Sequence, residues 1–355
     1  MDRRQFLQTG GAGAVGLAVA PGATAVPTRP RADRTHWVWI RGDRDRAAWQ
    51  EVLGTARRAG ITAALVDASP DGLRQAVEIA APLGVRVHAW MITMMEGGQE
   101  AAHPEWYAVN REGQSTATHP PYVDYYRFMC PSRAAVRRHK VERARQRLAV
   151  PGVAGLHLDY IRLPDVILPR ALWPVYGIVQ DREYPPYDYC YCAVCRDTFQ
   201  ARTGIDPLDL EDPSQNAAWL QYRYDAVTEV VHALSQTARG AGVRVTAAVF
   251  PSPSIARRLV RQDWPRWPLD AVLPMVYNGF YQEGTDWIEP TVREGVTALG
   301  GRMPLYAGLY VPDLDPAGLA EAARRALAGG ADGVAVFEGV GTSPAHWDAL
   351  AEALR

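Results

Sequence analysis

Two residue patterns alternate along this sequence from His36 to the C-terminus, and this alternation limits the folds open to the chain more than any other feature. Short runs rich in Val, Ile, Ala and Trp alternate with stretches of helical spacing, which is typical of repeated βα units and a parallel sheet. The predicted strands are residues 36–41, 62–67, 86–93, 155–162, 244–250, 271–278, 304–311 and 333–338. Helical stretches follow, for example residues 46–59, 71–83, 133–148, 217–239 and 316–328.

Eight such units predict an α/β fold, a single-domain (β/α)8 TIM barrel with long loops after strands 3 and 4. The rival arrangement is a doubly wound open sheet. Its dinucleotide-binding version needs a glycine-rich turn after the first strand, but residues 41–44 read RGDR and contain a single glycine. The closed barrel is therefore the expected fold.

The N-terminus has the pattern of an export signal. Residues 2–7 read DRRQFL, a twin-arginine pattern, and a Gly/Ala-rich apolar run and an Ala-Thr-Ala cleavage site at 23–25 follow. The apolar run is too short and too rich in glycine to span a bilayer about 30 Å thick. We expect a signal peptide at 1–25, a linker at 26–35 and a barrel domain at 36–355, with a periplasmic or extracellular location and no membrane attachment after signal removal.

The composition argues against polyanionic partners. The formal net charge is −1, so we expect no nucleic-acid partner. Two connections, residues 94–132 and 163–216, are much longer than ordinary βα turns, and both follow strands, which places them on the C-terminal face where barrel active sites form. They are rich in aromatic side chains suited to sugars or to a small loop core: Trp106, Tyr107, Tyr122, Tyr125, Tyr126, Trp173, Tyr176, Tyr184, Tyr187, Tyr189 and Tyr191.

The fourth predicted strand carries polar residues at inward positions. Alternation places Leu156 and Leu158 against the helices, and it places His157 and Asp159 inside the barrel near its C-terminal mouth. A carboxylate there is costly to bury without a partner or a role. Either an arginine neutralises Asp159, or this carboxylate serves catalysis or substrate binding.

Four segments of the chain resemble a known family. GLHLDYIRLPD (155–165), CYCAVCRDTFQARTGIDP (190–207), the stretch from AAVFPSPS to RQDW (247–264) and LPMVYN (273–278) are similar to glycosyl-hydrolase-like family ten. The resemblance is dense over residues 36–278 and implies a barrel that acts on a polysaccharide. Strand four also resembles amylase-type barrels, in which the aspartate at the position of Asp159 is the nucleophile. In this chain His157 replaces the arginine of that motif, and strand five ends without the glutamate that would be the acid.

Hydrolysis of a glycosidic bond requires a second carboxyl group, about 5 Å from the first for retention and about 6.5–9.5 Å for inversion. Glu338, at the end of strand eight, and Asp263, in the loop after strand five, are the preferred candidates. Asp67 and Glu96 are further candidates, and any of the four could instead cap a helix or orient the substrate.

Several other residues are expected to bind the sugar. Tyr277 and Asn278 end strand six in a pattern that resembles chitinase-type barrels, and they are expected to contact sugar hydroxyls, with a buried structural tyrosine as the alternative. The remaining predicted substrate-binding residues are His88, Trp90, His157, Arg162 and Trp264. For the histidines, a hydrogen-bonded place in the core is the alternative.

The four cysteines form a separate signal. Cys190, Cys192 and Cys195 are clustered, and Cys130 ends the neighbouring long loop. Four thiolates could bind a structural zinc ion, but two disulfides, which an exported protein allows, or free thiols would also explain them. No cofactor is expected for catalysis.

Three functions remain open at this stage. The first is a glycosidase that cleaves an extracytoplasmic polysaccharide or oligosaccharide with carboxylate acid/base chemistry, in which Asp159 is the nucleophile or the base. The second is a carbohydrate-binding barrel without activity, because strand five lacks the glutamate. The third is a metal-dependent hydrolase of acylated sugars, which would require a metal held by His88, His157 and Asp159.

Overall fold

All eight predicted strands form, and all their pairings are parallel. In the computed structural model, which describes residues 34–355, the strands are β1 Trp37–Arg41, β2 Ala63–Asp67, β3 Arg86–Ile92, β4 Gly155–Asp159, β5 Arg244–Val249, β6 Ala271–Pro274, β7 Tyr306–Tyr310 and β8 Gly333–Phe337. The sheet order is β6-β5-β4-β3-β2-β1-β8-β7. Parallel bridges from Val272 to Leu305 and from Met275 to Gly308 join β6 to β7 and close the ring. The prediction of a single-domain (β/α)8 barrel is therefore confirmed.

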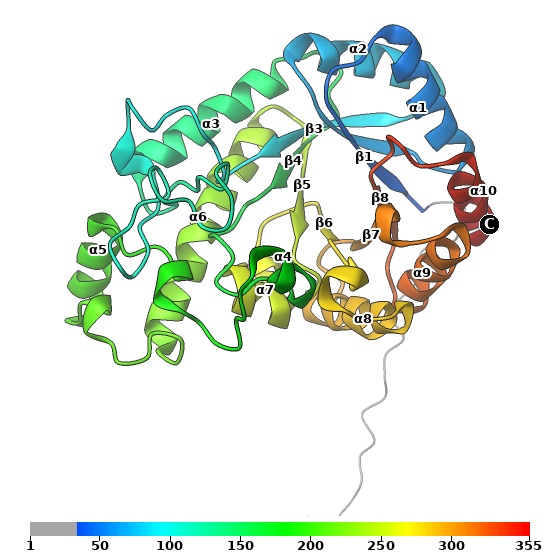
Figure 1. The fold of residues 1–355 in the computed structure, drawn as a ribbon. Coiled ribbons are helices and arrows are strands. Elements are labelled where there is room, and N and C mark those ends of the chain that lie inside the picture. The colour runs from blue at the N-terminus through cyan, green and yellow to red at the C-terminus, as the bar shows by residue number, and fades with distance from the viewer. Residues whose placement is uncertain (1–33) are drawn as a thin grey trace, which may run out of the picture.

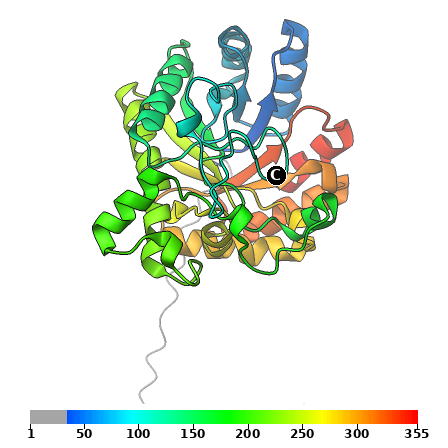
Figure 2. The same cartoon turned by 60° about the vertical axis from the view of Figure 1, so that its left-hand side comes forward.

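Helices surround the strands on the outside (Figures 1 and 2). They are α1 Arg46–Arg58, α2 Pro70–Ala80, α3 Ala134–Leu148, α4 Trp173–Tyr176, α5 Ala193–Thr203, α6 Ala217–Gly240, α7 Pro253–Val260, α8 Ile288–Leu299, α9 Pro316–Ala328 and α10 Pro344–Leu354. Side-chain caps explain several starts: Asp45, Ser69 and Asn216 each accept a hydrogen bond from a backbone amide in the first turn. In the described part of the chain, no helix combines the length and apolar character needed to cross a bilayer. The predicted signal peptide and all but the last two residues of the predicted linker lie outside the described residues.

Side chains alternate between two cores because successive strand residues point to opposite faces of the sheet. Leu156 and Leu158 of β4 belong to the large core between strands and helices. The barrel interior is filled by a smaller cluster of large side chains, including Trp37, Trp39 and Trp90. The predicted directions of the β4 residues are therefore confirmed.

Six strands end earlier than predicted. β3, β5, β7 and β8 each end one residue early, whereas β4 ends three residues early at Asp159 and β6 four residues early at Pro274. In β4 the cause is local: Tyr160 has a positive φ of 47°, which turns the chain out of the sheet, and its amide N–H donates to Oδ1 of Asp159 at 2.6 Å. The early ends leave the polar residues that follow β4 and β6 in loops at the mouth of the barrel.

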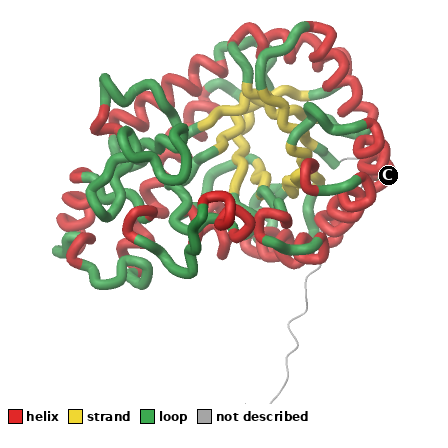
Figure 3. The backbone as a smooth tube through the Cα atoms, in the orientation of Figure 1, coloured by secondary structure: helices red, strands yellow, loops and turns green. Residues whose placement is uncertain are grey.

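The long loops after β3 and β4 pack against each other (Figure 3). The amide of Tyr191 donates to the carbonyl of Val109 at 2.7 Å, and the amide of Arg111 donates to the carbonyl of Asp188 at 3.1 Å. The two loops therefore form one structural unit, although about 80 residues separate the paired segments in sequence.

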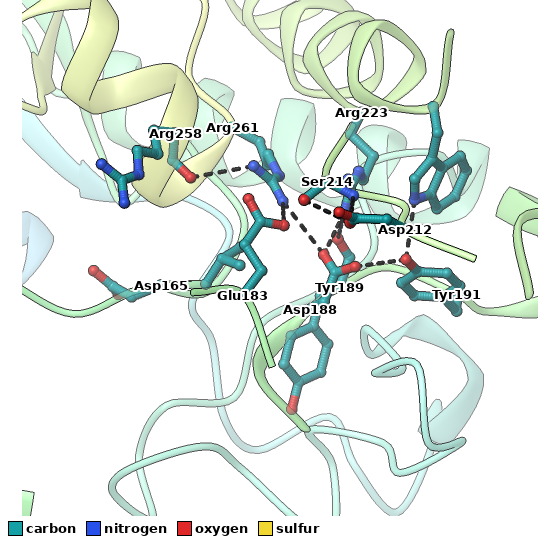
Figure 4. A network of polar contacts seen from close by, with 12 residues as sticks. Asp165, Glu183, Asp188, Tyr189, Tyr191, Asp212, Ser214, Arg223, Arg258 and Arg261 are labelled. Atoms are coloured by element: carbon teal, nitrogen blue, oxygen red, sulfur yellow. Dashed lines mark hydrogen bonds and ion pairs between the residues drawn. The ribbon is translucent and has the colours of Figure 1, made fainter. Parts of the chain in front are cut away.

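A buried network of charged side chains fixes the second of these loops to the helices behind it (Figure 4). Asp188 pairs with Arg223 of α6, and Glu183 pairs with Arg261, which directly follows α7. Burial alone would raise the pKa of Asp188, but Arg223 and Arg261 lower it below the ordinary value. Tyr191 also donates a hydrogen bond to Asp188. The loop is thus held by charge pairs that are shielded from solvent.

Candidate active site

A cleft of about 350 Å³ opens at the C-terminal ends of the strands. This is the face on which barrel enzymes build their active sites. More than half of the residues that line it are aromatic: Trp39, Tyr122, Tyr125, Tyr126, Tyr160, Tyr176, Phe250, Tyr277, Phe280, Tyr281, Tyr310 and Phe337. The charged residues of its lining are Arg41, Asp159, Arg162 and Asp165. Flat rings around a few polar groups are suited to a small-molecule or sugar ligand.

Asp159 lies in this cleft at the end of β4, with only 8% of its surface exposed. Its Oδ2 accepts a hydrogen bond from Nε1 of Trp90 at 3.0 Å, and its Oδ1 accepts from the Tyr160 amide. Burial raises the pKa of Asp159 above its ordinary value, although these hydrogen bonds and the nearby arginines act in the opposite direction. Among the described residues, no ion pair involves Asp159, so its carboxyl group in the cleft is held by two neutral donors and by no cation.

The second carboxyl group in the cleft, Asp165, is engaged by its neighbours. Arg162 donates to Oδ2 of Asp165 at 2.7 Å, and the hydroxyl of Tyr126 donates to the same oxygen. Asp165 and Tyr126 raise the pKa of Arg162 although burial lowers it, so Arg162 stays charged. Arg162 therefore lies in the cleft as predicted, where it holds Asp165 rather than Asp159.

The charges of Asp159 and Glu338 both act on Tyr277. Burial raises the pKa of Tyr277 well above the ordinary value, and the charges of Asp159 and Glu338 raise it further. The Tyr277 phenol is thus within electrostatic range of both carboxyl groups. Glu338 follows the end of β8 and does not itself line the cleft. Its charge also raises the pKa of Tyr310, which does line the cleft.

Two predicted binding residues lie directly beneath the cleft floor. Trp90 contacts Asp159, and the guanidinium of Arg41 lies 4.7 Å from the centre of its ring. His157 accepts a hydrogen bond at Nε2 from Trp39 at 3.1 Å and lies 2.9 Å from Thr246 through Nδ1. Burial lowers the pKa of His157 well below its ordinary value, so the ring is neutral and both nitrogens are occupied. These two residues support the floor instead of lining it.

Three predicted binding residues lie elsewhere, for reasons of strand position and packing. His88 pairs in register with Gly155, the first residue of β4, and so lies near the opposite end of the barrel from Asp159. Trp264 is fully buried against Gly295 of α8. Asn278 donates its side-chain N–H to the carbonyl of Glu283 at 2.9 Å and does not line the cleft. Their predicted positions in the cleft are therefore corrected.

The other candidate carboxylates are held by basic residues outside the cleft. Asp263 pairs with Arg257, and Asp67 pairs with Arg147. Glu96 pairs with residues of α3; burial alone would raise its pKa, but Lys140 above all lowers it to about 2. The basic partners of Asp67 and Glu96 come from α3, which is distant in sequence, whereas Arg257 lies six residues before Asp263.

Several cleft residues were missed by the sequence analysis, among them Arg41, Asp165, Tyr310 and Phe337. The sequence could have indicated three of them. Arg41, Tyr310 and Phe337 each end a strand, and the carboxyl ends of the strands face the cleft. Of the loop aromatics considered as sugar contacts, Tyr122, Tyr125, Tyr126 and Tyr176 line the cleft.

Only one group of residues in the described part of the chain could hold a metal ion, and it is the cysteine cluster rather than His88, His157 and Asp159. His88 lies away from the cleft, and both ring nitrogens of His157 already have partners. The geometry therefore argues against the metal-dependent hydrolase.

No protein-family model and no curated protein sequence matches the chain. Solved structures do resemble it. A β-galactosidase from the Antarctic haloarchaeon Halorubrum lacusprofundi superposes with a TM-score of 0.64 at 15% identity, over 90% of this chain and 57% of that one. A GH42 β-galactosidase from G. stearothermophilus gives 0.62 at 12% identity, over 92% of this chain and 57% of that one. The catalytic domain of a β-amylase from Paenibacillus polymyxa gives 0.59 at 11% identity, over 88% and 95%.

These similarities show a shared barrel fold. This chain spans little more than half the length of the two β-galactosidases and most of the β-amylase domain. At such low identities, residue roles do not transfer from one chain to the other.

Proposed function

We propose that this protein, which shares its barrel fold with glycosidases, hydrolyses a glycosidic bond in an extracytoplasmic polysaccharide or oligosaccharide. The observation that carries the proposal is the carboxyl group of Asp159, which no cation holds, in an aromatic cleft at the C-terminal ends of the strands. The motif resemblance to glycosyl-hydrolase-like family ten and the twin-arginine pattern at the N-terminus support the polysaccharide substrate and a periplasmic or extracellular location.

In this proposal Asp159 acts as the general acid, in place of the nucleophile or base expected from the sequence. Its raised pKa favours the protonated form, which an acid must have before it gives its proton to the glycosidic oxygen. Glu338 is the candidate for the second carboxylate: it does not line the cleft itself, but its charge acts on Tyr277 and Tyr310, which do. When the bond breaks, the leaving sugar takes the proton of Asp159, and water gives its hydroxyl group to the anomeric carbon and its remaining proton to the second carboxylate.

A screen of bacterial and plant polysaccharides for released reducing ends tests the proposal. Asp159→Asn is expected to reduce turnover by at least about 100-fold while it leaves folding intact, in line with the usual contribution of a general acid. Glu338→Gln is expected to have a comparable effect. Asp348→Asn, an exposed carboxyl-to-amide change on α10, is the matched control and should retain activity.

A carbohydrate-binding barrel without activity is the second candidate. One observation favours it: among the residues that line the cleft, Asp159 is the single carboxyl group not held by a cation. Saturable binding of a polysaccharide without release of reducing ends would support this candidate and overturn hydrolysis.

A further inference from the structure

Four cysteine side chains meet between the two long loops. Cys130 ends the loop after β3, and Cys190, Cys192 and Cys195 belong to the loop after β4 and the start of α5. Their Sγ atoms all lie within 4.8 Å of one another. Each side chain is almost completely buried, with at most 3% of its surface exposed.

The sulfur separations match those around one tetrahedral ion. Sγ of Cys130 lies 3.5 Å from Sγ of Cys192 and 3.5 Å from Sγ of Cys195, and the last two atoms are 3.7 Å apart. Zinc–sulfur bonds of about 2.3 Å place the sulfurs at the corners of a tetrahedron about 3.8 Å apart. Two disulfides would instead bring the sulfurs together in bonded pairs about 2.05 Å apart, but all four cysteines are unbonded.

Two polar groups and the start of a helix lie against the cluster. The amide of Val109 points at Sγ of Cys190 at 3.4 Å, and Oγ of Ser132 lies 3.3 Å from Sγ of Cys195. Such contacts commonly orient the sulfur ligands of a metal. Cys192 is the N-cap of α5 and Cys195 lies in its first turn, where the helix dipole favours negative charge.

We propose that the four cysteines bind one zinc ion, which joins the loop after β3 to the loop after β4. The choice of zinc follows from four thiolates in tetrahedral positions, a buried site without open positions and the Cys-x-Cys-x-x-Cys spacing. The inference concerns a site that is separate from the cleft, and it stands whether or not the protein hydrolyses sugars.

The ion would also hold one wall of the cleft in place. Tyr122, from the loop after β3, stacks on Tyr187 of the other loop with ring centres 4.8 Å apart. Its hydroxyl donates to the backbone carbonyl of Asp165 at 2.7 Å. Both contacts join one loop to the other. Their geometry should therefore depend on the zinc ion that holds the two loops together.

Metal analysis and thiol counting of the full chain, purified from cells grown with zinc, test the proposal. The expected result is one zinc per chain and four thiols that react only after denaturation in chelator. The wild-type protein reloaded with Co²⁺ should show the intense thiolate-to-metal absorption of a tetrahedral sulfur site. Disulfides, thiols without zinc after loading, or bound iron in place of zinc would each overturn the proposal.

Two variants distinguish a residue that binds the zinc ion from a nearby residue that does not. Cys195→Ser is expected to lose zinc, whereas Gln200→Ala, a change at an exposed position of the same helix α5, should retain it. Hydrogen exchange should become faster in both long loops of Cys195→Ser and remain unchanged in β1 and β2. Should Cys195→Ser fail to fold, the Co²⁺ spectrum of the wild-type protein still decides the question.

Discussion

Nε1 of Trp90 donates a hydrogen bond to Oδ2 of Asp159 at 3.0 Å, from the strand next to the one that carries the carboxyl group. A hydrogen bond from a neutral donor stabilises the ionised carboxylate, so this contact lowers the pKa of Asp159 while burial raises it. The protonation state of Asp159 on β4 therefore depends on two opposed effects: burial raises its pKa, and the hydrogen bond from Trp90 on β3 lowers it.

Trp90→Phe should shift the pH profile of kcat/KM. Removal of the indole N–H raises the pKa of Asp159 further, so an acid at this position remains protonated to higher pH and the alkaline limb moves upward. Trp39→Phe is the matched control, because its indole donates to His157 instead. Identical alkaline limbs in the wild type and Trp90→Phe would contradict the role of Asp159 as the acid.

Arg162→Met should strongly destabilise the protein. The change leaves Asp165 buried without its cation, and loss of one partner of a buried pair costs about 3–5 kcal/mol. Arg162→Met/Asp165→Asn should recover part of this loss, since the amide carries no charge. Urea unfolding of the wild type, both single variants and the double variant gives the coupling energy. Simple additivity would show that the two side chains do not act as a pair.

The buried histidines should make the protein sensitive to mild acid. Burial lowers the pKa of His88 to about 3 and that of His36 to about 4, and it lowers the pKa of His157 well below the ordinary value. The unfolded chain takes up protons near pH 6.5 and the folded chain does not, so the free energy of unfolding should fall as the pH drops below about 6.5. The slope reaches about 1.4 kcal/mol per pH unit for each histidine.

Urea unfolding between about pH 7 and pH 4.5 measures this slope. His88→Asn should reduce it, whereas His232→Gln, a change at an exposed position of α6, should leave it unchanged. If the free energy of unfolding were constant over this pH range, the buried histidines would not be uncharged in the folded protein, and the prediction would be wrong.

Gly308→Ala should destabilise the seam that closes the barrel. A Cβ atom at Gly308 would lie 2.9 Å from the carbonyl oxygen of Pro274, a backbone atom of β6 that cannot move without opening the ring. The expected loss in the free energy of unfolding is about 1–3 kcal/mol, as for other overpacked sites. Gly240→Ala, at the end of α6 with open space around it, is the matched control. Equal stabilities of the two variants would count against a tight seam.

Residue periodicity alone predicted the barrel and the directions of the β4 side chains. Alternation with period two sends Leu156 and Leu158 outward and His157 and Asp159 inward, whatever the neighbouring strands contain. The helix starts were also predictable, because caps such as Asp45 act within one turn. These features depend on interactions over a few residues.

Strand ends and binding roles were harder to predict. Tyr160 leaves the sheet through a left-handed turn that strand propensity does not show. His88 and Asp159 both point inward, but the stagger between strands places them at different heights in the barrel. Sequence gives the direction of a side chain, and pairing with neighbouring strands gives its height.

The sequence by itself determined that this chain forms a ring of eight parallel strands with an acidic side chain inside it. Only the tertiary structure decided that Asp159 has no ion-pair partner while Asp67 and Glu96 are held by basic residues, and that Cys130 meets the three other cysteines. The physical reason is range. Side-chain direction follows from local backbone geometry, whereas the pairing of charges and the convergence of ligands require segments brought together by the closed sheet and its long loops.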